Sequence, residues 1–191
     1  MSDYNSTCFA ILATPRSGSS VLSGIVHSLG VNMGSRLMVA GEHNEKGFYE
    51  DMEFLEIHRH MYGTIPYLFD DPIAKNKDLL IPAYINLVRK KCVQKLWGVK
   101  DPRMVFLIST LHKYLTSTCE LKIISRYEEA RIESLKWAEE LGIPTLSVTY
   151  EDLMTNTKDC VGKIAAFCGV EDPTTISMAG LLVDKSLWHN R

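Results

Sequence analysis

Apolar residues alternate with polar stretches in a pattern that predicts strands followed by helices. Residues 8–13 form a continuous apolar run, which is typical of a strand buried on both faces of a parallel sheet. Residues 14–20 are small or polar and interrupt this run. Apolar residues then recur at helical spacing through 21–29, and Gly30 is a typical helix stop. The beginning of the chain therefore predicts a strand, a loop and a helix.

The same alternation continues downstream. Short apolar runs of strand length are each followed by a longer segment with helical spacing, which indicates a mostly parallel sheet flanked by helices. We therefore expect an α/β, P-loop-like fold of three layers. The predicted strands are 96–99, 121–125 and 145–149, and the predicted helices are 103–114, 128–141 and a last helix that includes 161–167 and ends near Gly169.

Two stretches fall outside this alternation. Residues 32–51 are polar, glycine-bearing and irregular, and residues 62–78 resemble a loop with two prolines and an acidic pair. Loops of this length in a compact domain are often binding loops or lids. Neither stretch has the composition of an interdomain linker, so we expect a single domain over residues 1–191.

Charge and composition exclude several classes of partner. Lys and Arg total 21 and Asp and Glu total 23, so a general nucleic-acid binder is not expected. No apolar run approaches the ~20 residues of a membrane span. The first residues lack the basic and apolar parts of a secretory leader, and the five cysteines form an odd set without metal-ligand spacing. These features favour reduced thiols and a cytoplasmic location, and they leave the oligomeric state open.

The loop at 14–20, with the sequence Thr-Pro-Arg-Ser-Gly-Ser-Ser, has the composition of an anion site. Gly18 permits unusual backbone dihedrals, and the first amides of the next helix would point at a ligand. Arg16 adds a fixed positive charge, although an ordinary capped turn is the alternative. The loop lacks the Gly-Lys-Ser/Thr of a Walker A motif. The candidate anion-binding residues are Arg16, Ser17, Gly18, Ser19 and Ser20.

A second candidate phosphate site follows the predicted strand 121–125. Arg126 stands at the end of that strand, and Ser134 lies eight residues further on in the predicted helix. Arginine offers a planar fork of donors and serine one hydroxyl, so the two side chains are suited to one phosphate. A surface arginine and an unrelated helical serine are the alternative.

These motifs resemble the PAPS-dependent sulfotransferase superfamily, where PAPS is 3′-phosphoadenosine-5′-phosphosulfate. The 14–20 loop is similar to the Pro-Arg-Ser-Gly 5′-phosphosulfate loop of bacterial and tyrosylprotein members. Arg126 and Ser134 are similar to the family's 3′-phosphate motif in type and spacing. The resemblance runs from Phe9 to about Gly169, and three further segments agree with it: 97–103 with its Lys-Asp-Pro, 41–51, and 150–153, which is taken as mainly structural.

The resemblance implies in-line transfer of a sulfuryl group from PAPS to an acceptor hydroxyl or amine, with no metal. Arg16 and the loop amides would stabilise the nucleotide leaving group. Lys100 would be the second cation, on a sulfuryl or bridging oxygen, or else only the partner of a nearby carboxylate. The acceptor would be a small molecule, a saccharide or a peptide.

The family also takes a general base from the segment after the first helix. Glu42 and Glu50 are the candidates, with His43 behind them, and the alternative for either carboxylate is a loop anion paired with a basic side chain. His58 and His60 are expected on a solvated helix face.

Two other functions stay open at this stage. A P-loop nucleotide kinase would share the fold but needs a Walker lysine and a magnesium-binding acid, and a non-catalytic nucleotide-binding module would not turn PAPS over. The aromatic residues of the two irregular stretches either line an acceptor pocket or serve packing; they are Phe48, Tyr49, Tyr62, Tyr67 and Phe69.

Overall fold

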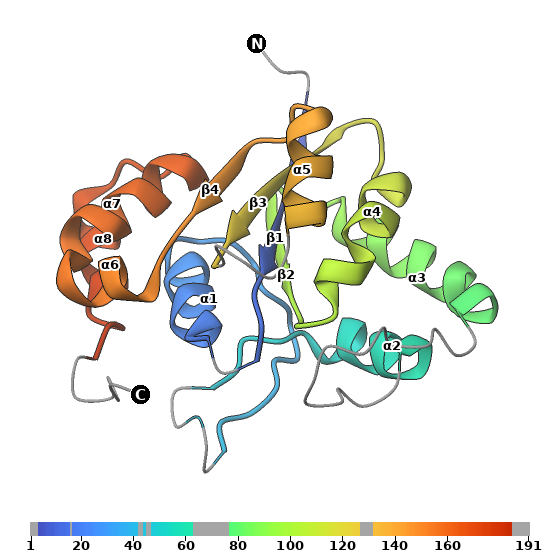
Figure 1. Cartoon of the computed structure of the whole chain (residues 1–191), viewed down its shortest axis with the longest axis horizontal. Coiled ribbons are helices and arrows are strands. Elements are labelled where there is room, and N and C mark those ends of the chain that lie inside the picture. Colours follow the sequence, from blue (N-terminus) through green and yellow to red (C-terminus); the bar gives the residue numbers. More distant parts are fainter. Residues whose placement is uncertain are drawn as a thin grey trace.

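The fold is built on a central parallel sheet (Figure 1). The computed structural model describes residues 4–15, 17–41, 44, 47–62, 77–126 and 132–184. Within these residues the sheet has four strands in the order β2-β1-β3-β4, and every neighbouring pair is parallel. The strands are β1 (Ser6–Leu12), β2 (Leu96–Lys100), β3 (Cys119–Ser125) and β4 (Thr145–Ser147). The predicted parallel sheet is confirmed.

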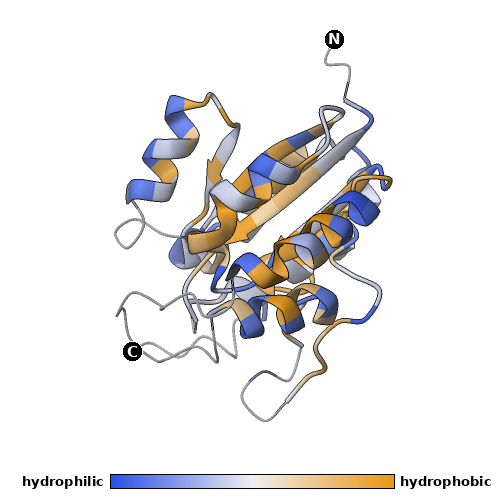
Figure 2. Ribbon diagram, turned by 90° about the vertical axis from the view of Figure 1, so that its right-hand side faces the viewer, coloured by the Kyte–Doolittle hydropathy of each residue, from blue (hydrophilic) through white to orange (hydrophobic). Residues whose placement is uncertain are grey.

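The helices cover both faces of this sheet, which confirms the three-layer α/β class. One apolar core joins the sheet to α2, α3, α4 and α5, and the other joins it to α1, α6, α7 and α8 (Figures 1 and 2). Alternate residues of β1 supply the two cores, because side chains along a strand point to opposite faces. The helices are α1 (Ser19–Ser28), α2 (Met52–Tyr62), α3 (Lys77–Lys91), α4 (Met104–Tyr114), α5 (Ile132–Glu140), α6 (Tyr150–Thr155), α7 (Thr157–Cys168) and α8 (Pro173–Gly180).

Four of the described helices, α2, α3, α6 and α8, had no counterpart among the predicted helix ranges, although a helix face was expected at His58 and His60. Helix α3 contains Pro82 and shows little helical periodicity, yet it buries Tyr84 and Val88 in the core. Packing against the sheet therefore outweighs its weak local preference. Helix α8 does carry a local start signal, because Asp172 caps it by accepting from the Thr175 amide at 2.7 Å, and proline follows at its first position.

The irregular segment 32–51 behaves as expected where it is described. It contains isolated bridges, such as Leu37 with Asp51, in place of regular elements. It runs below the carboxyl ends of the strands between α1 and α2 (Figure 1). Most of the other predicted loop, at 63–76, lies outside the described residues.

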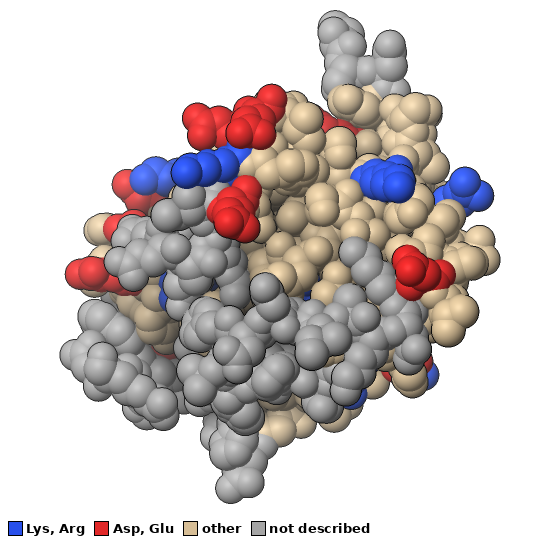
Figure 3. All heavy atoms as spheres, turned by 45° about the vertical axis from the view of Figure 1, so that its right-hand side comes forward, with Lys and Arg blue, Asp and Glu red and all other residues tan. Residues whose placement is uncertain are grey.

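The surface carries both signs of charge. On the face shown in Figure 3, basic and acidic side chains are interspersed, and neither forms a continuous patch. None of the helices in the described ranges combines the length and the apolar character that crossing a bilayer requires.

Candidate active site

Strands β2, β1 and β3 are neighbours in the sheet, and their carboxyl ends place Lys100 and Arg126 on either side of the end of β1. Ile11 of β1 pairs with Lys100, the last residue of β2. On the other side, the Arg126 amide donates to Leu12 O at 3.0 Å, just beyond β3. The 14–20 loop leaves β1 between them. The carboxyl edge of a parallel sheet is the usual place for a ligand in α/β proteins.

The loop presents an uncapped helix start. Gly18 precedes α1 with φ 80° and ψ 13°, in the left-handed region, as its sequence position predicted. It has no side chain to accept from the first amides of α1, so these amides can donate to an anion. A Cβ on Gly18 would lie 2.6 Å from Cδ2 of Tyr150, a residue at the start of α6.

The loop serines differ in how they are engaged. The Ser17 hydroxyl donates to Thr14 O at 2.7 Å, so its proton stays within the loop. The Ser20 hydroxyl instead accepts from Asn44 Nδ2 at 2.8 Å. A hydroxyl that accepts from an amide keeps its own proton to donate. Asn44 thus ties the 32–51 segment to the loop, and Ser20 keeps a proton that it can donate to a phosphate.

Replacing Gly18 with alanine should therefore damage the loop. The left-handed backbone and the contact with Tyr150 both disfavour a Cβ, and together they should cost about 2 kcal/mol of stability. Affinity for a doubly phosphorylated nucleotide should also fall, because the first amides of α1 would shift. Urea unfolding and isothermal titration measure the two effects. Gly30→Ala is the matched control, since φ is 92° there but no atom lies within 4 Å of the added Cβ. A loss of affinity in both variants would contradict the specific role of Gly18.

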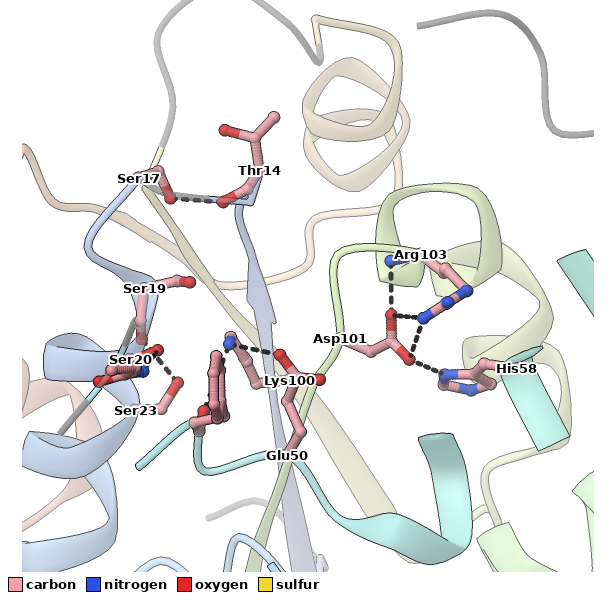
Figure 4. A network of polar contacts seen from close by, with 12 residues as sticks. Thr14, Ser17, Ser19, Ser20, Ser23, Glu50, His58, Lys100, Asp101 and Arg103 are labelled. Atoms are coloured by element: carbon pink, nitrogen blue, oxygen red, sulfur yellow. Dashed lines mark hydrogen bonds and ion pairs between the residues drawn. The ribbon is translucent and has the colours of Figure 1, made fainter. Parts of the chain in front are cut away.

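Lys100 and Glu50 form a buried ion pair at the centre of this edge. Lys100 Nζ donates to Glu50 Oε1 at 2.6 Å and to Phe48 O at 3.3 Å, and the two residues are only 5% and 7% exposed (Figure 4). The expected second cation and one of the candidate bases are thus direct partners. Lys100 therefore does pair with a carboxylate, and that carboxylate, Glu50, is itself a candidate base.

Burial raises the pKa of Glu50 above its usual range, although the charge and the hydrogen bond of Lys100 act in the opposite direction. Asp101 adds to the increase in pKa, and Arg103 opposes it. A carboxylate whose pKa is raised is a stronger base and holds a transferred proton more readily. This property suits Glu50 to general-base chemistry.

The residues beside Glu50 hold it in place. Tyr49 has φ 54°, in the left-handed region that few non-glycine residues occupy, and its ring lies 3.0 Å from the position of a Cβ on Gly24 of α1. On the other side, the Asp51 carboxylate accepts from the α2 amide of Glu53 and from Lys91 Nζ. For Tyr49, these contacts favour packing over an acceptor pocket.

The second phosphate motif is only partly assembled. The Arg126 guanidinium lies 4.9 Å from the centre of the Tyr150 ring, and that ring covers Gly18. Tyr150 therefore links the loop after β1 to Arg126 after β3, a packing role that agrees with the structural interpretation of segment 150–153. Ser134 donates to Val105 O at 2.9 Å, so it must rotate to donate to a phosphate beside Arg126.

A buried cluster adjoins the Lys100–Glu50 pair. Asp101 accepts from His58 Nδ1 at 3.0 Å and from the Arg103 guanidinium at 2.9 and 3.1 Å. The expectation that His58 lies on a solvated face is wrong: it is fully buried and packs against the rings of Phe54 and Tyr84, which also contact each other. His60 is exposed, as expected.

Some predicted site residues cannot be placed. Arg16, Glu42 and His43 lie outside the described residues, as do Tyr67 and Phe69. In the part of the chain that is described, no group of three or more His, Cys, Asp or Glu side chains is arranged to hold a metal ion.

Comparison with known proteins gives a likeness among solved structures and none among family models or curated proteins. No protein-family model matches the chain. No curated protein matches it either. A solved structure of the sulfotransferase domain from the Synechococcus PCC 7002 olefin synthase is similar, with 20% sequence identity and a TM-score of 0.46 over 91% of this chain and 76% of that domain.

The fold and the site define an α/β protein in which three features lie at the carboxyl ends of the parallel strands. These are the start of α1 after Gly18, the buried Lys100–Glu50 ion pair, and Arg126.

Proposed function

We propose that this chain is a sulfotransferase that moves the sulfuryl group of PAPS to an acceptor hydroxyl or amine. One observation carries the proposal: the buried Lys100–Glu50 pair, the uncapped start of α1 and Arg126 follow three adjacent strands at one edge of the sheet. Donors for two phosphates and a paired acid and base are the parts that sulfuryl transfer needs.

The residues present fit such a nucleotide. The first amides of α1 and the Ser20 hydroxyl supply neutral donors for the 5′-phosphosulfate, and Arg16 supplies a charge. Arg126, held against the Tyr150 ring, supplies a fixed fork for the 3′-phosphate. The donors are backbone amides, hydroxyls and guanidinium groups, which bind phosphate oxygens without a metal.

Sulfuryl transfer forms one bond to sulfur and breaks another. The acceptor oxygen or nitrogen attacks sulfur, the bond from sulfur to the bridging oxygen of the 5′-phosphate breaks, and 3′,5′-bisphosphoadenosine leaves. The acceptor proton passes to Glu50. Lys100 and the α1 amides offset the negative charge that grows on the bridging oxygen, and such a donor is typically worth a few kcal/mol.

The resting ion pair is compatible with both roles. An ammonium has three donors, so Lys100 can contact Glu50, Phe48 O and one ligand oxygen at the same time. Glu50 uses Oε1 for Lys100, and Oε2 can take the acceptor proton. The pair can therefore act without first separating.

Nucleotide binding tests the proposal without knowledge of the acceptor. The desulfated product, 3′,5′-bisphosphoadenosine, should raise the melting temperature in the absence of divalent metal; at ~100 times Kd the gain is about 2.7 kcal/mol. AMP should stabilise less, because it lacks the phosphate that Arg126 contacts. Arg126→Ala should reduce the difference between the two ligands, since a charge-assisted contact is worth roughly 1.5–3 kcal/mol. Differential scanning fluorimetry measures these shifts.

The controls separate the alternatives. Lys113→Ala removes an exposed charge from α4 and should leave both shifts unchanged. Equal shifts with the two nucleotides, or a strict need for Mg²⁺, would favour a kinase. Radiolabelled PAPS with alcohols, phenols, sugars and amines should give a labelled product. Tight binding without transfer to any of them would favour a binding module.

A further inference from the structure

We propose that His58 is a positioning residue for this reaction: by binding Asp101 it holds helix α2 against the end of β2, and so keeps Glu50 and Lys100 aligned during transfer. The inference rests on the proposed function, and His58 itself is not placed in contact with substrate.

Two polar contacts connect the end of β2 with helix α2 and the residue just before it. Lys100 ends β2 and Asp101 follows it, while Glu50 stands just before α2 and His58 lies within that helix. The Lys100–Glu50 contact is therefore one link between the two elements, and the His58–Asp101 contact is a second (Figure 4). In the view of Figure 4, the second link lies on the side of the pair away from the serine loop.

Several hydrogen bonds hold the Asp101 carboxylate in place. Besides His58 and the Arg103 guanidinium, it accepts from the Arg103 amide at 2.8 Å, and its own carbonyl accepts from the Met104 amide at 2.8 Å. These bonds fix the turn from β2 into α4. His58 is the partner that comes from another part of the chain, so it connects this turn to α2.

The two links respond differently to the reaction. When Glu50 takes the acceptor proton it becomes neutral, and its charge-assisted bond to Lys100 weakens. No proton transfer in the reaction changes Asp101 or His58, so the second link persists while the first is weak. An error of about 1 Å in the position of a catalytic group can cost about 10²-fold in rate, so this alignment matters for kcat.

The imidazole contributes one polar contact. Because an ionised carboxylate only accepts, His58 donates to Asp101 through Nδ1. Its Nε2 and the hydroxyl of Tyr84 are buried without a hydrogen-bond partner in the part of the chain that is described. An asparagine, whose amide can take the place of Nδ1–H, should therefore preserve the link, whereas leucine keeps the apolar volume and removes it.

The experiment compares His58→Leu, His58→Asn and the wild type, with His60→Leu as the control on the exposed side of the same helix. We expect His58→Leu to lower kcat about 10-fold or more while the KM for PAPS and the affinity for the desulfated nucleotide change less than about 3-fold. His58→Asn should restore kcat to within about 3-fold of the wild type. His60→Leu should leave all values unchanged.

Hydrogen exchange gives a readout that does not depend on activity. Amides of α2 should exchange faster in His58→Leu than in the wild type or His58→Asn, also with the desulfated nucleotide bound. If the wild type fails to consume PAPS, the proposed function fails, and the exchange data still decide the role of the link. Unchanged exchange and kcat in His58→Leu would overturn the inference. So would equal damage in His58→Asn, or a loss of nucleotide affinity that matches the loss of kcat, because each indicates a merely structural role.

Discussion

Replacing Lys100 with methionine should lower kcat for sulfuryl transfer by about 10²-fold or more, because the variant loses a positive charge that acts mainly in the transition state. Affinity for the desulfated nucleotide should fall less. The second cause of the loss is indirect: without Lys100 the pKa of the buried Glu50 rises further, since the charge and hydrogen bond of Lys100 now lower it. Less of the base is then ionised at neutral pH.

The pH profile separates these two causes. In the wild type, kcat/KM should fall as the pH decreases through the pKa of Glu50, because the protonated acid cannot accept a proton. In Lys100→Met this decrease should begin at higher pH. Glu50→Gln should abolish transfer with nucleotide binding almost intact, because an amide keeps the size and polarity but not the basicity.

Two comparisons make the result specific. Lys90→Met removes an exposed lysine whose Nζ lies 2.7 Å from Glu53, and it should leave kcat unchanged, since exposed pairs contribute about 0–1 kcal/mol. The double variant Lys100→Met with Glu50→Gln should be no less active than Glu50→Gln alone, because the two residues act as one pair and the effects of replacing them are not additive. Near-normal kcat in both single variants would remove these residues from the chemistry and make Glu42 and His43 the next bases to test.

Arg16→Ala should also lower kcat by about 10²-fold or more, because it removes a positive charge from the loop that would bind the leaving group.

Replacing Asp101 with asparagine should destabilise the protein by about 3–5 kcal/mol at pH 7, because it removes a buried carboxylate that is ion-paired with the Arg103 guanidinium at 2.9 Å and accepts from His58. The Asp101 side chain is 1% exposed, so water cannot take its place. Urea unfolding measures the difference. Glu139→Gln, which changes an exposed carboxyl on α5, should have little effect.

The same variant should change how stability depends on pH. Burial alone would raise the pKa of Asp101, but the hydrogen bond and charge of His58 and the charge of Arg103 outweigh it and lower the pKa to about 2, against an ordinary 3.8. A carboxyl whose pKa is lower in the folded than in the unfolded protein stabilises the fold at pH values above its unfolded pKa. For Asp101 this stabilisation is lost as the pH falls from about 4 towards about 2. The difference corresponds to about 2 kcal/mol. If the difference in unfolding free energy between the wild type and Asp101→Asn stays constant over that range, the pKa of Asp101 is not lowered by folding.

Local sequence was sufficient for the frame of the site. The apolar run at 8–13, the glycine-bearing loop and the helical spacing after it depend on neighbouring residues, so β1, an unusual backbone conformation at Gly18 and α1 could all be predicted. Helix α3 could not, because its residues favour the helix only when Tyr84 and Val88 pack on the sheet.

The α/β class and the order of the candidate site residues along the chain follow from the amino-acid pattern: the anion loop, the candidate bases, Lys100 and Arg126. Which of these residues meet depends on the packing of strands and helices. Lys100 binds Glu50, the Tyr150 ring covers Gly18, and His58 turns inward to Asp101. Each of these contacts joins residues far apart in the chain, and it exists because parallel strands end at a common edge and the helices pack against both faces of the sheet. The burial of His58 did have a local signal, because Phe54, Leu55 and Met61 lie three or four residues away on the same face of α2. The contact with Asp101 had none, since Asp101 comes from a distant part of the chain.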